Sequence, residues 1–213
     1  MFLPKEIMGL PLGYALFQKG FTVLHGSSIS HNSKGIIFSG LSGSGKSTVI
    51  SNLINKGFNY LSDDLVCLDS RNNLHSYTNT LAVQSIGKDA KQCFNEITPL
   101  HDKRKRSLYF HKKNNRIPTP AKLCYFLEWG SKNEIFELKG AQLFEKIFPN
   151  LFREENFEGN QSDKELLRHK LMEDVSVLSS LKCFLIERNL RNNSCFLNEI
   201  KKHIDSQIHN EKK

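Results

Sequence analysis

The sequence predicts an α/β fold with a phosphate-binding loop at its core. Two observations support this prediction: a glycine-rich motif, and flanking apolar runs with the periodicity of a strand before it and a helix after it. Residues 40–47 read Gly-Leu-Ser-Gly-Ser-Gly-Lys-Ser. They match G-x-x-x-x-G-K-[ST], a loop whose backbone N–H groups surround nucleotide phosphates. Strand, loop and helix occur in the order that such a site requires.

The segments next to the loop carry clear signals. Residues 36–39 are apolar and predict a buried strand, and residues 48–56 have apolar positions at helical spacing. Gly57 stands where a helix C-terminus favours a positive φ. Ahead of the loop, residues 21–25 predict a strand, residues 27–30 continue extended, and residues 31–35 predict a turn.

The rest of the chain is predicted from periodicity and turn residues. A capping box at residues 162–165 precedes an amphipathic helix. We expect further helices at residues 88–97, 142–148 and 196–208, a polar loop or hairpin at 69–79, and strands at 58–61, 65–68, 122–128, 134–138 and 182–186.

Length and composition predict a single domain spanning residues 1–213, with an N-terminal segment at 1–20 and a polar tail at 209–213. The first twenty residues are interrupted by prolines and charges, so neither a membrane span nor a secretory signal is expected. We therefore expect a cytoplasmic protein. The net charge of +8 suits an anionic partner, but no reader motif predicts nucleic-acid binding.

Three further features of the sequence are a basic run, a single tryptophan and five cysteines. The basic run at residues 103–106 is either a solvated face or a loop that brings Arg104 or Arg106 to a transferring phosphoryl group. Trp129, the only tryptophan, is interpreted as a core or interface anchor. The five cysteines form no C-x-x-C pair and are expected to be mostly buried thiols: Cys67, Cys93, Cys124, Cys183 and Cys195.

Within the loop, glycines permit a tight turn and close approach to phosphates. Lys46 supplies a movable charge for the outer phosphates, and the Ser47 hydroxyl is placed to ligate Mg²⁺. The residues that we expect to bind the nucleotide are Gly40, Ser42, Gly43, Ser44, Gly45, Lys46, Ser47 and Thr48.

Two adjacent carboxylates, Asp63 and Asp64, follow the next predicted strand. Strand ends beside a phosphate loop face the same crevice of an α/β sheet. There, one carboxylate can hold Mg²⁺ while the other takes a proton from an attacking hydroxyl. A solvated turn or a helix cap is the structural alternative. His25 stands at a strand end before Gly26, and by spacing alone it indicates no role.

Together these residues resemble the catalytic domain of the HPr kinase/phosphorylase family. The resemblance rests on His25-Gly26, the glycine loop, Lys56-Gly57 and residues 61–64 (Leu-Ser-Asp-Asp), and it covers about residues 21–68. It implies a fold related to that of phosphoenolpyruvate carboxykinase, with a P-loop nucleotide-binding core on a mixed sheet. The short chain is similar to relatives that lack the separate N-terminal domain. The resemblance also suggests an oligomeric assembly.

The resemblance implies an ATP- and Mg²⁺-dependent kinase that phosphorylates a serine hydroxyl on a small protein, a peptide or a serine-like small molecule. It assigns Lys46 to the β- and γ-phosphates, Ser47 to Mg²⁺, Asp63 to the catalytic base, Asp64 to the metal, and His25 to the neighbourhood of the phosphates. The family's second signature has a Glu and an Arg before a glycine, and residues 83–87 lack both. The second metal ligand is therefore unassigned, and the reverse, phosphorylase reaction has no support.

Two other functions stay open. Adenylylsulfate kinases carry the same loop sequence, although they place it nearer the N-terminus and usually follow it with an Asp-Gly-Asp type of pattern. A nucleotide-binding sensor or scaffold without catalysis is the second alternative, because the second signature is missing.

Overall fold

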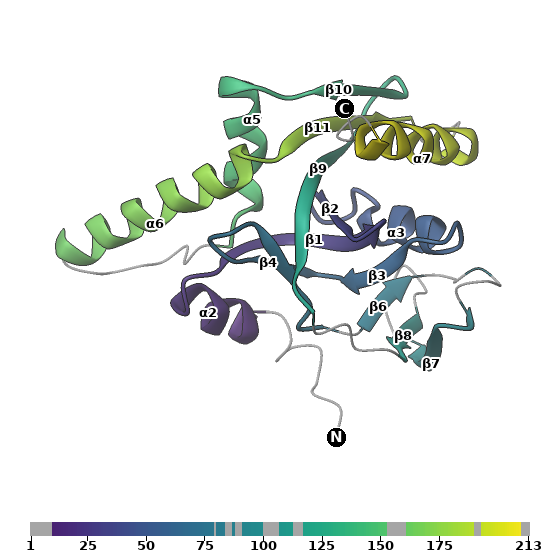
Figure 1. Cartoon of the computed structure of the whole chain (residues 1–213), viewed down its shortest axis with the longest axis horizontal. Coiled ribbons are helices and arrows are strands. Elements are labelled where there is room, and N and C mark those ends of the chain that lie inside the picture. Colours follow the sequence, from purple (N-terminus) through teal and green to yellow (C-terminus); the bar gives the residue numbers. More distant parts are fainter. Residues whose placement is uncertain are drawn as a thin grey trace.

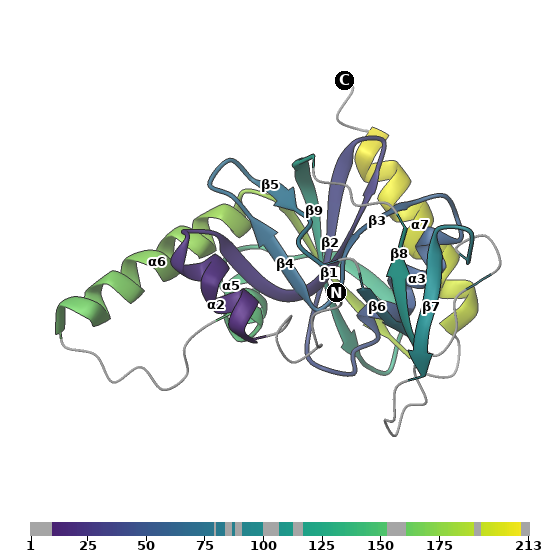
Figure 2. The same ribbon diagram turned by 90° about the horizontal axis from the view of Figure 1, so that it is seen from below.

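The computed structural model describes residues 10–78, 80–83, 87, 91–99, 107–112, 117–152, 161–189 and 193–209. This part of the chain has an α/β fold with a mixed eight-stranded sheet and a smaller three-stranded one (Figures 1 and 2). The α/β class and the mixed sheet are therefore as predicted. The elements are α2 (Leu10–Gln18), β1 (Thr22–His31), β2 (Lys34–Ser39), α3 (Lys46–Ile54), β3 (Asn59–Ser62), β4 (Leu65–Leu68), β5 (Asn73–His75), β6 (Thr80–Val83), β7 (Phe94–Pro99), β8 (Ser107–His111), β9 (Thr119–Trp129), β10 (Glu134–Glu137), α5 (Gly140–Ile147), the 3-10 turn η1 (Phe148–Asn150), α6 (Gln161–Ser179), β11 (Lys182–Arg188) and α7 (Asn193–His209).

The strands of the large sheet run in the order β10-β11-β9-β2-β1-β4-β5, and β3 also pairs with β1. β9 is parallel to both β2 and β11, whereas the other pairs are antiparallel. Ser39 is in register with Phe126, and Trp129 with Arg188. The carboxyl ends of β2, β9 and β11 consequently lie at one edge of the sheet.

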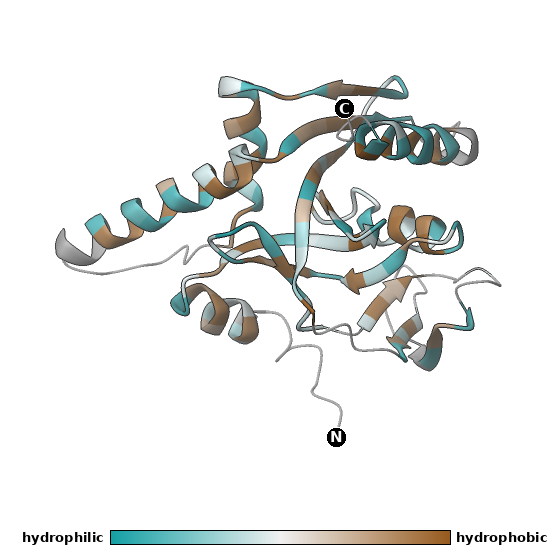
Figure 3. Ribbon diagram, in the orientation of Figure 1, coloured by the Kyte–Doolittle hydropathy of each residue, from teal (hydrophilic) through white to brown (hydrophobic). Residues whose placement is uncertain are grey.

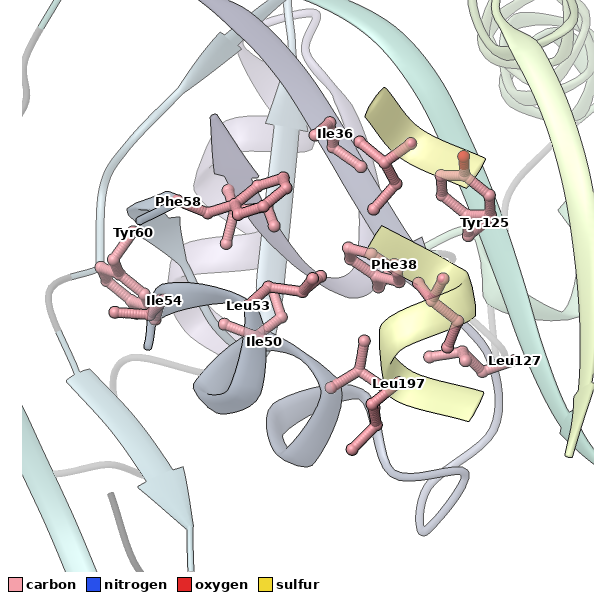
Figure 4. Packing of buried hydrophobic residues seen from close by; sticks show 14 of the residues in the cluster. Ile36, Phe38, Ile50, Leu53, Ile54, Phe58, Tyr60, Tyr125, Leu127 and Leu197 are labelled. Carbon is pink, nitrogen blue, oxygen red and sulfur yellow. The ribbon is translucent and has the colours of Figure 1, made fainter. Parts of the chain in front are cut away.

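Both faces of the central strands of the large sheet are buried. Along β2, Ile36 and Phe38 belong to one apolar cluster, whereas Ile37 belongs to the other. The first cluster includes side chains of α3 and α7, and Figure 4 shows Ile50 and Leu197 packed near Phe38. The second cluster includes side chains of α5 and α6. Burial on both faces explains why the central strands read as continuous apolar runs.

A tight hairpin joins β1 to β2. Its two turn residues, Asn32 and Ser33, have φ angles of 49° and 59°. Positive φ at both central positions is the geometry whose twist matches paired strands. The predicted turn at residues 31–35 is confirmed. It sets the register of β2 against β1, and β2 then leads directly into the glycine loop.

The prediction of a helix at residues 88–97 is wrong for its C-terminal part. Residues 94–99 form β7, which pairs with β8 in the three-stranded sheet β6-β8-β7, and residues 88–90 lie outside the described part of the chain. Phe94 is buried against Tyr60, with ring centroids 5.3 Å apart. Tertiary contacts of this kind override a helical spacing of apolar residues. No pattern in the sequence predicted α2, β6 or β8.

α6 is a helix, as predicted, and the described side chains that it buries lie toward its C-terminal end. It begins at Gln161, one residue before the expected cap. Leu178 is fully buried, whereas Leu166 and Met172 are 71% and 67% exposed. Figure 1 shows its N-terminal end extending away from the sheets, and Figure 3 shows hydrophobic and hydrophilic residues alternating along it.

Among the described helices, none is long and apolar enough to cross a membrane.

The burial pattern predicts different costs for two leucine truncations. Leu53 of α3 is fully buried in the first cluster. Leu53→Ala should lower the free energy of unfolding by about 2–5 kcal/mol, because it removes buried methyl groups and leaves a cavity. The matched control, Leu166→Ala on exposed α6, should change it by less than about 0.5 kcal/mol. Urea unfolding measures both, and equal effects would contradict this account of the core.

Candidate functional site

The glycine loop connects β2 to α3 at the edge where β2, β9 and β11 end. Gly40, Gly43 and Gly45 have φ angles of 140°, 87° and 86°. Gly45 occupies the N-cap of α3 in the left-handed conformation. Residues with a Cβ rarely adopt these angles, so the backbone itself requires glycine at these positions.

Lys46 is the first residue of α3, and its side chain turns back into the loop. Its Nζ donates hydrogen bonds to the carbonyl oxygens of Gly40 and Leu41, at 2.6 and 3.1 Å. The residue is only 7% exposed. A buried ammonium held by loop carbonyls is positioned to exchange these neutral acceptors for phosphate oxygens, which bind a cation more strongly.

A carboxylate lies directly beside the start of α3. The Ser47 hydroxyl donates to both carboxylate oxygens of Asp63, each at 3.1 Å. Asp63 also accepts a short hydrogen bond from the Ser27 hydroxyl, and the backbone N–H of Ala82 in β6 lies 3.4 Å from Oδ2. Three elements, β1, α3 and β6, therefore converge on one carboxylate in the turn after β3.

The environment of Asp63 favours the protonated acid more than water does. The residue is 3% exposed, and burial raises the pKa of its carboxyl from the ordinary 3.8 to about 6. The neighbouring Asp64 charge raises the pKa as well, whereas hydrogen bonds from Ser27, Ala82 and Ser47 oppose the shift. A carboxyl with a pKa of about 6 gains or loses its proton close to neutral pH.

Asp64 differs from its neighbour in exposure and backbone. It is partly exposed, with a φ of 71° at the turn between β3 and β4. Its carbonyl oxygen accepts hydrogen bonds from the Gly26 N–H at 3.3 Å and from His25 Nδ1 at 3.1 Å. The His-Gly pair thus holds the turn that presents the two aspartates. A Cβ at position 26 would collide with the Phe38 carbonyl, so strand packing requires that glycine.

The remaining predicted loop residues are placed as follows. Ser42 and Thr48 are exposed. Ser44 is buried, and its hydroxyl oxygen has no hydrogen-bond partner among the described residues. An orphaned hydroxyl and left-handed glycines, in a loop that also contains a buried lysine, fit a site made for an oxygen-rich ligand.

Three site residues were missed or misread in the sequence. Ser27 looked like ordinary strand, and nothing in the sequence pairs it with Asp63. Arg188 ends β11 beneath the loop, which no local pattern indicates. Of the two roles expected for Trp129, core or interface anchor, the core is ruled out: it is 41% exposed, and its Nε1 donates to the carbonyl of Gly43 at 3.0 Å.

The donor set around Ser47 suits a hard cation. Mg²⁺ at nucleotide sites takes one or two protein oxygens and completes its shell with phosphate and water. The Ser47 hydroxyl and the Asp63 carboxylate supply such a pair. Across the described residues, no group of three or more His, Cys, Asp or Glu side chains could hold a metal by itself.

Four of the five cysteine side chains lie in the described part of the chain. Cys67, Cys124 and Cys183 are buried free thiols, as predicted, whereas Cys93 is exposed. The side chain of Cys195 lies outside the described part, as do residues 103–106 of the basic run and residues 84–86 of the segment compared with the second signature.

Comparison of the sequence with models of protein families gives no match, and comparison with curated proteins gives none either.

The raised pKa of Asp63 predicts a pH dependence of stability without nucleotide or divalent cation. Because the folded-state pKa of about 6 exceeds the ordinary 3.8, protonated Asp63 favours the folded chain. This contribution is fully present below about pH 3.8 and is lost as the pH rises through about 6. It amounts to about 3 kcal/mol.

Asp63→Asn should therefore gain stability relative to the wild type between pH 4 and 7, because the amide carries no charge to desolvate. Urea unfolding at several pH values in EDTA measures this change. Glu199→Gln, an exposed substitution on α7, serves as the control and should track the wild type. Parallel profiles for Asp63→Asn and the wild type would contradict the predicted shift.

Proposed function

We propose that the protein is an ATP- and Mg²⁺-dependent kinase that phosphorylates a serine hydroxyl, with a P-loop site of the HPr kinase type. The observation that carries this proposal is the contact of Ser47 with the Asp63 carboxylate at the start of the helix that follows the glycine loop. A hydroxyl and a carboxylate at this point, beside a buried lysine, are the protein groups that phosphoryl transfer requires.

The resemblance gains support from contacts between its separate parts. His25 and Gly26 both donate to the Asp64 carbonyl, and Ser47 donates to Asp63. The His-Gly pair, the loop and the Asp-Asp pair are thus joined into one cluster. A chance combination of three short motifs would not be expected to meet in this way.

The chain's own groups account for nucleotide binding. The N-terminus of α3 offers unpaired N–H groups and the positive end of the helix dipole to a phosphate. The Lys46 ammonium adds a full positive charge within the loop. Bound Mg²⁺ would supply charge neutralisation between the outer phosphates, held by Ser47 and Asp63.

The two carboxylates differ in what they can reach. Asp63 is almost completely buried and already accepts hydrogen bonds from Ser27 and Ser47, so we assign it to the cation side. Asp64 is partly exposed at a turn, so we assign it to the acceptor side. This assignment is the reverse of the one that the resemblance implies.

In the proposed reaction, the acceptor oxygen forms a bond to the γ-phosphorus while the bond from that phosphorus to the β,γ-bridging oxygen breaks. The acceptor's proton passes to the Asp64 carboxylate, and ADP leaves with the electron pair of the broken bond. Lys46 stabilises the charge on the phosphoryl oxygens throughout. The acceptor would be a serine hydroxyl of a small protein, a peptide or a serine-like small molecule.

Asp64→Asn should lower phosphoryl transfer at least 100-fold, because a positioned general base contributes about that much. Its affinity for ATP with Mg²⁺ should stay within about threefold of the wild type, because Asp63 still holds the cation side. Asp63→Asn should instead lose the gain in ATP affinity that Mg²⁺ provides. Transfer of label from γ-labelled ATP to lysate proteins or free serine, together with calorimetric titration of ATP, measures both effects.

The exposed substitution Glu173→Gln on α6 is the control and should match the wild type. Wild-type transfer by both aspartate variants would contradict the kinase proposal. Loss of transfer in Asp63→Asn with metal-dependent binding intact would overturn only the division of roles between the two carboxylates. ATP binding without transfer to any acceptor would favour a nucleotide sensor.

A further inference from the structure

A buried arginine lies directly against the glycine loop. Arg188 ends β11 and is fully buried. One of its terminal nitrogens, Nη2, donates a short hydrogen bond to the carbonyl of Ser44. Its guanidinium also stacks on the Trp129 ring, 4.4 Å from the ring centroid. Because Trp129 and Arg188 are in register on parallel strands, both reach the loop from the same sheet edge.

The charge of Arg188 has no counter-charge in the described part of the chain. No described carboxylate forms an ion pair with it, and its Nε and Nη1 have no hydrogen-bond partner there. Burial lowers the pKa of the guanidinium to about 10, so it is still charged at neutral pH. A buried cation with unpaired donors is costly, and proteins rarely keep one without a partner.

The hydrogen bond from Arg188 also orients one peptide of the loop. The C=O of one residue and the N–H of the next point in opposite directions across a trans peptide. Holding the Ser44 carbonyl on the arginine side therefore turns the Gly45 N–H to the opposite side. A Cβ on Gly45 would collide with the guanidinium, so position 45 requires glycine for this contact as well.

We propose that Arg188 is a positioning residue for the glycine loop. Its buried positive charge is balanced by the negative charge of the phosphates of a nucleotide bound in that loop. Trp129 supports it by covering the guanidinium and holding the Gly43 carbonyl. The proposed ligand is a polyphosphate on the side of the loop away from Arg188, so its negative charge balances the guanidinium across the loop without contacting Nε or Nη1. The loop thus receives positive charge from Lys46 within it and from Arg188 behind it.

This inference rests on the proposed function only in requiring that the loop bind a nucleotide polyphosphate. It differs from a purely structural role for Arg188 in two measurable ways. A structural brace would support the folded chain whether or not ligand is bound, and its loss would weaken all ligands equally. A counter-charge costs stability without ligand, and its contribution grows with the charge of the ligand.

The test compares Arg188→Met, which removes the charge but keeps a long side chain, with Arg188→Lys, which keeps the charge. Calorimetric titrations of ATP, ADP and AMP give dissociation constants, and thermal unfolding without nucleotide gives stability. Emission from Trp129, the only tryptophan, reports on the loop in both variants.

Arg188→Met should weaken ATP binding about tenfold or more, with a smaller loss for ADP and the smallest for AMP. Its unfolding midpoint without nucleotide should equal or exceed that of the wild type, because replacing a buried charge by an apolar side chain is often neutral or stabilising. Arg188→Lys should keep most of the ATP affinity and the preference for ATP over AMP. ATP should change Trp129 emission in the wild type and in Arg188→Lys.

Undiminished ATP affinity in Arg188→Met, or equal losses for ATP and AMP, would overturn the inference. So would an Arg188→Met chain that unfolds more easily without nucleotide or fails to fold, because the arginine would then serve the fold itself. Equal loss in both variants would overturn it too, since the charge would not be the cause. A wild type that binds no ATP would instead contradict the proposed function.

Discussion

The parallel pairing of β9 with β2 and with β11 determines what surrounds the glycine loop. Parallel strands end at the same sheet edge, so the chain after Ser39, the side chain of Trp129 and the side chain of Arg188 meet there. Antiparallel pairing at either position would send one of these strand ends to the opposite edge. The rest of the candidate site depends on this arrangement.

Burial shifts the pKa of two groups of opposite charge in the site. The carboxyl of Asp63 has a raised pKa and the guanidinium of Arg188 a lowered one, in both cases because burial disfavours the charged form. Perturbed groups of this kind cluster where a protein binds or transforms a charged ligand. The glycine loop, which contacts Arg188 and leads into the helix that contacts Asp63, itself requires left-handed glycines. We interpret this concentration of unfavourable features as the cost of a preorganised phosphate site.

Much of the fold followed from local patterns, because the central strands and α3 carry strong periodicity and clear turn residues. Residues 65–68 and the turn at 31–35 are examples. Predictions failed where distant contacts decide, as at Phe94, which pairs in a strand and packs on Tyr60. α6 has the sequence of an amphipathic helix, but the sequence could not indicate that its buried side chains would lie toward its C-terminal end.

By itself, the sequence determined the position of the glycine loop, the strand and helix around it, and the adjacent aspartates. It could do so because glycine conformations, hydrophobic period and turn chemistry act over a few residues. Only the tertiary structure decided that Ser27 and Ser47 bind Asp63 rather than Asp64, and that Arg188 lies beneath the loop. Those contacts join residues 16 to 144 positions apart in the chain, and strand order and register decide which of them meet.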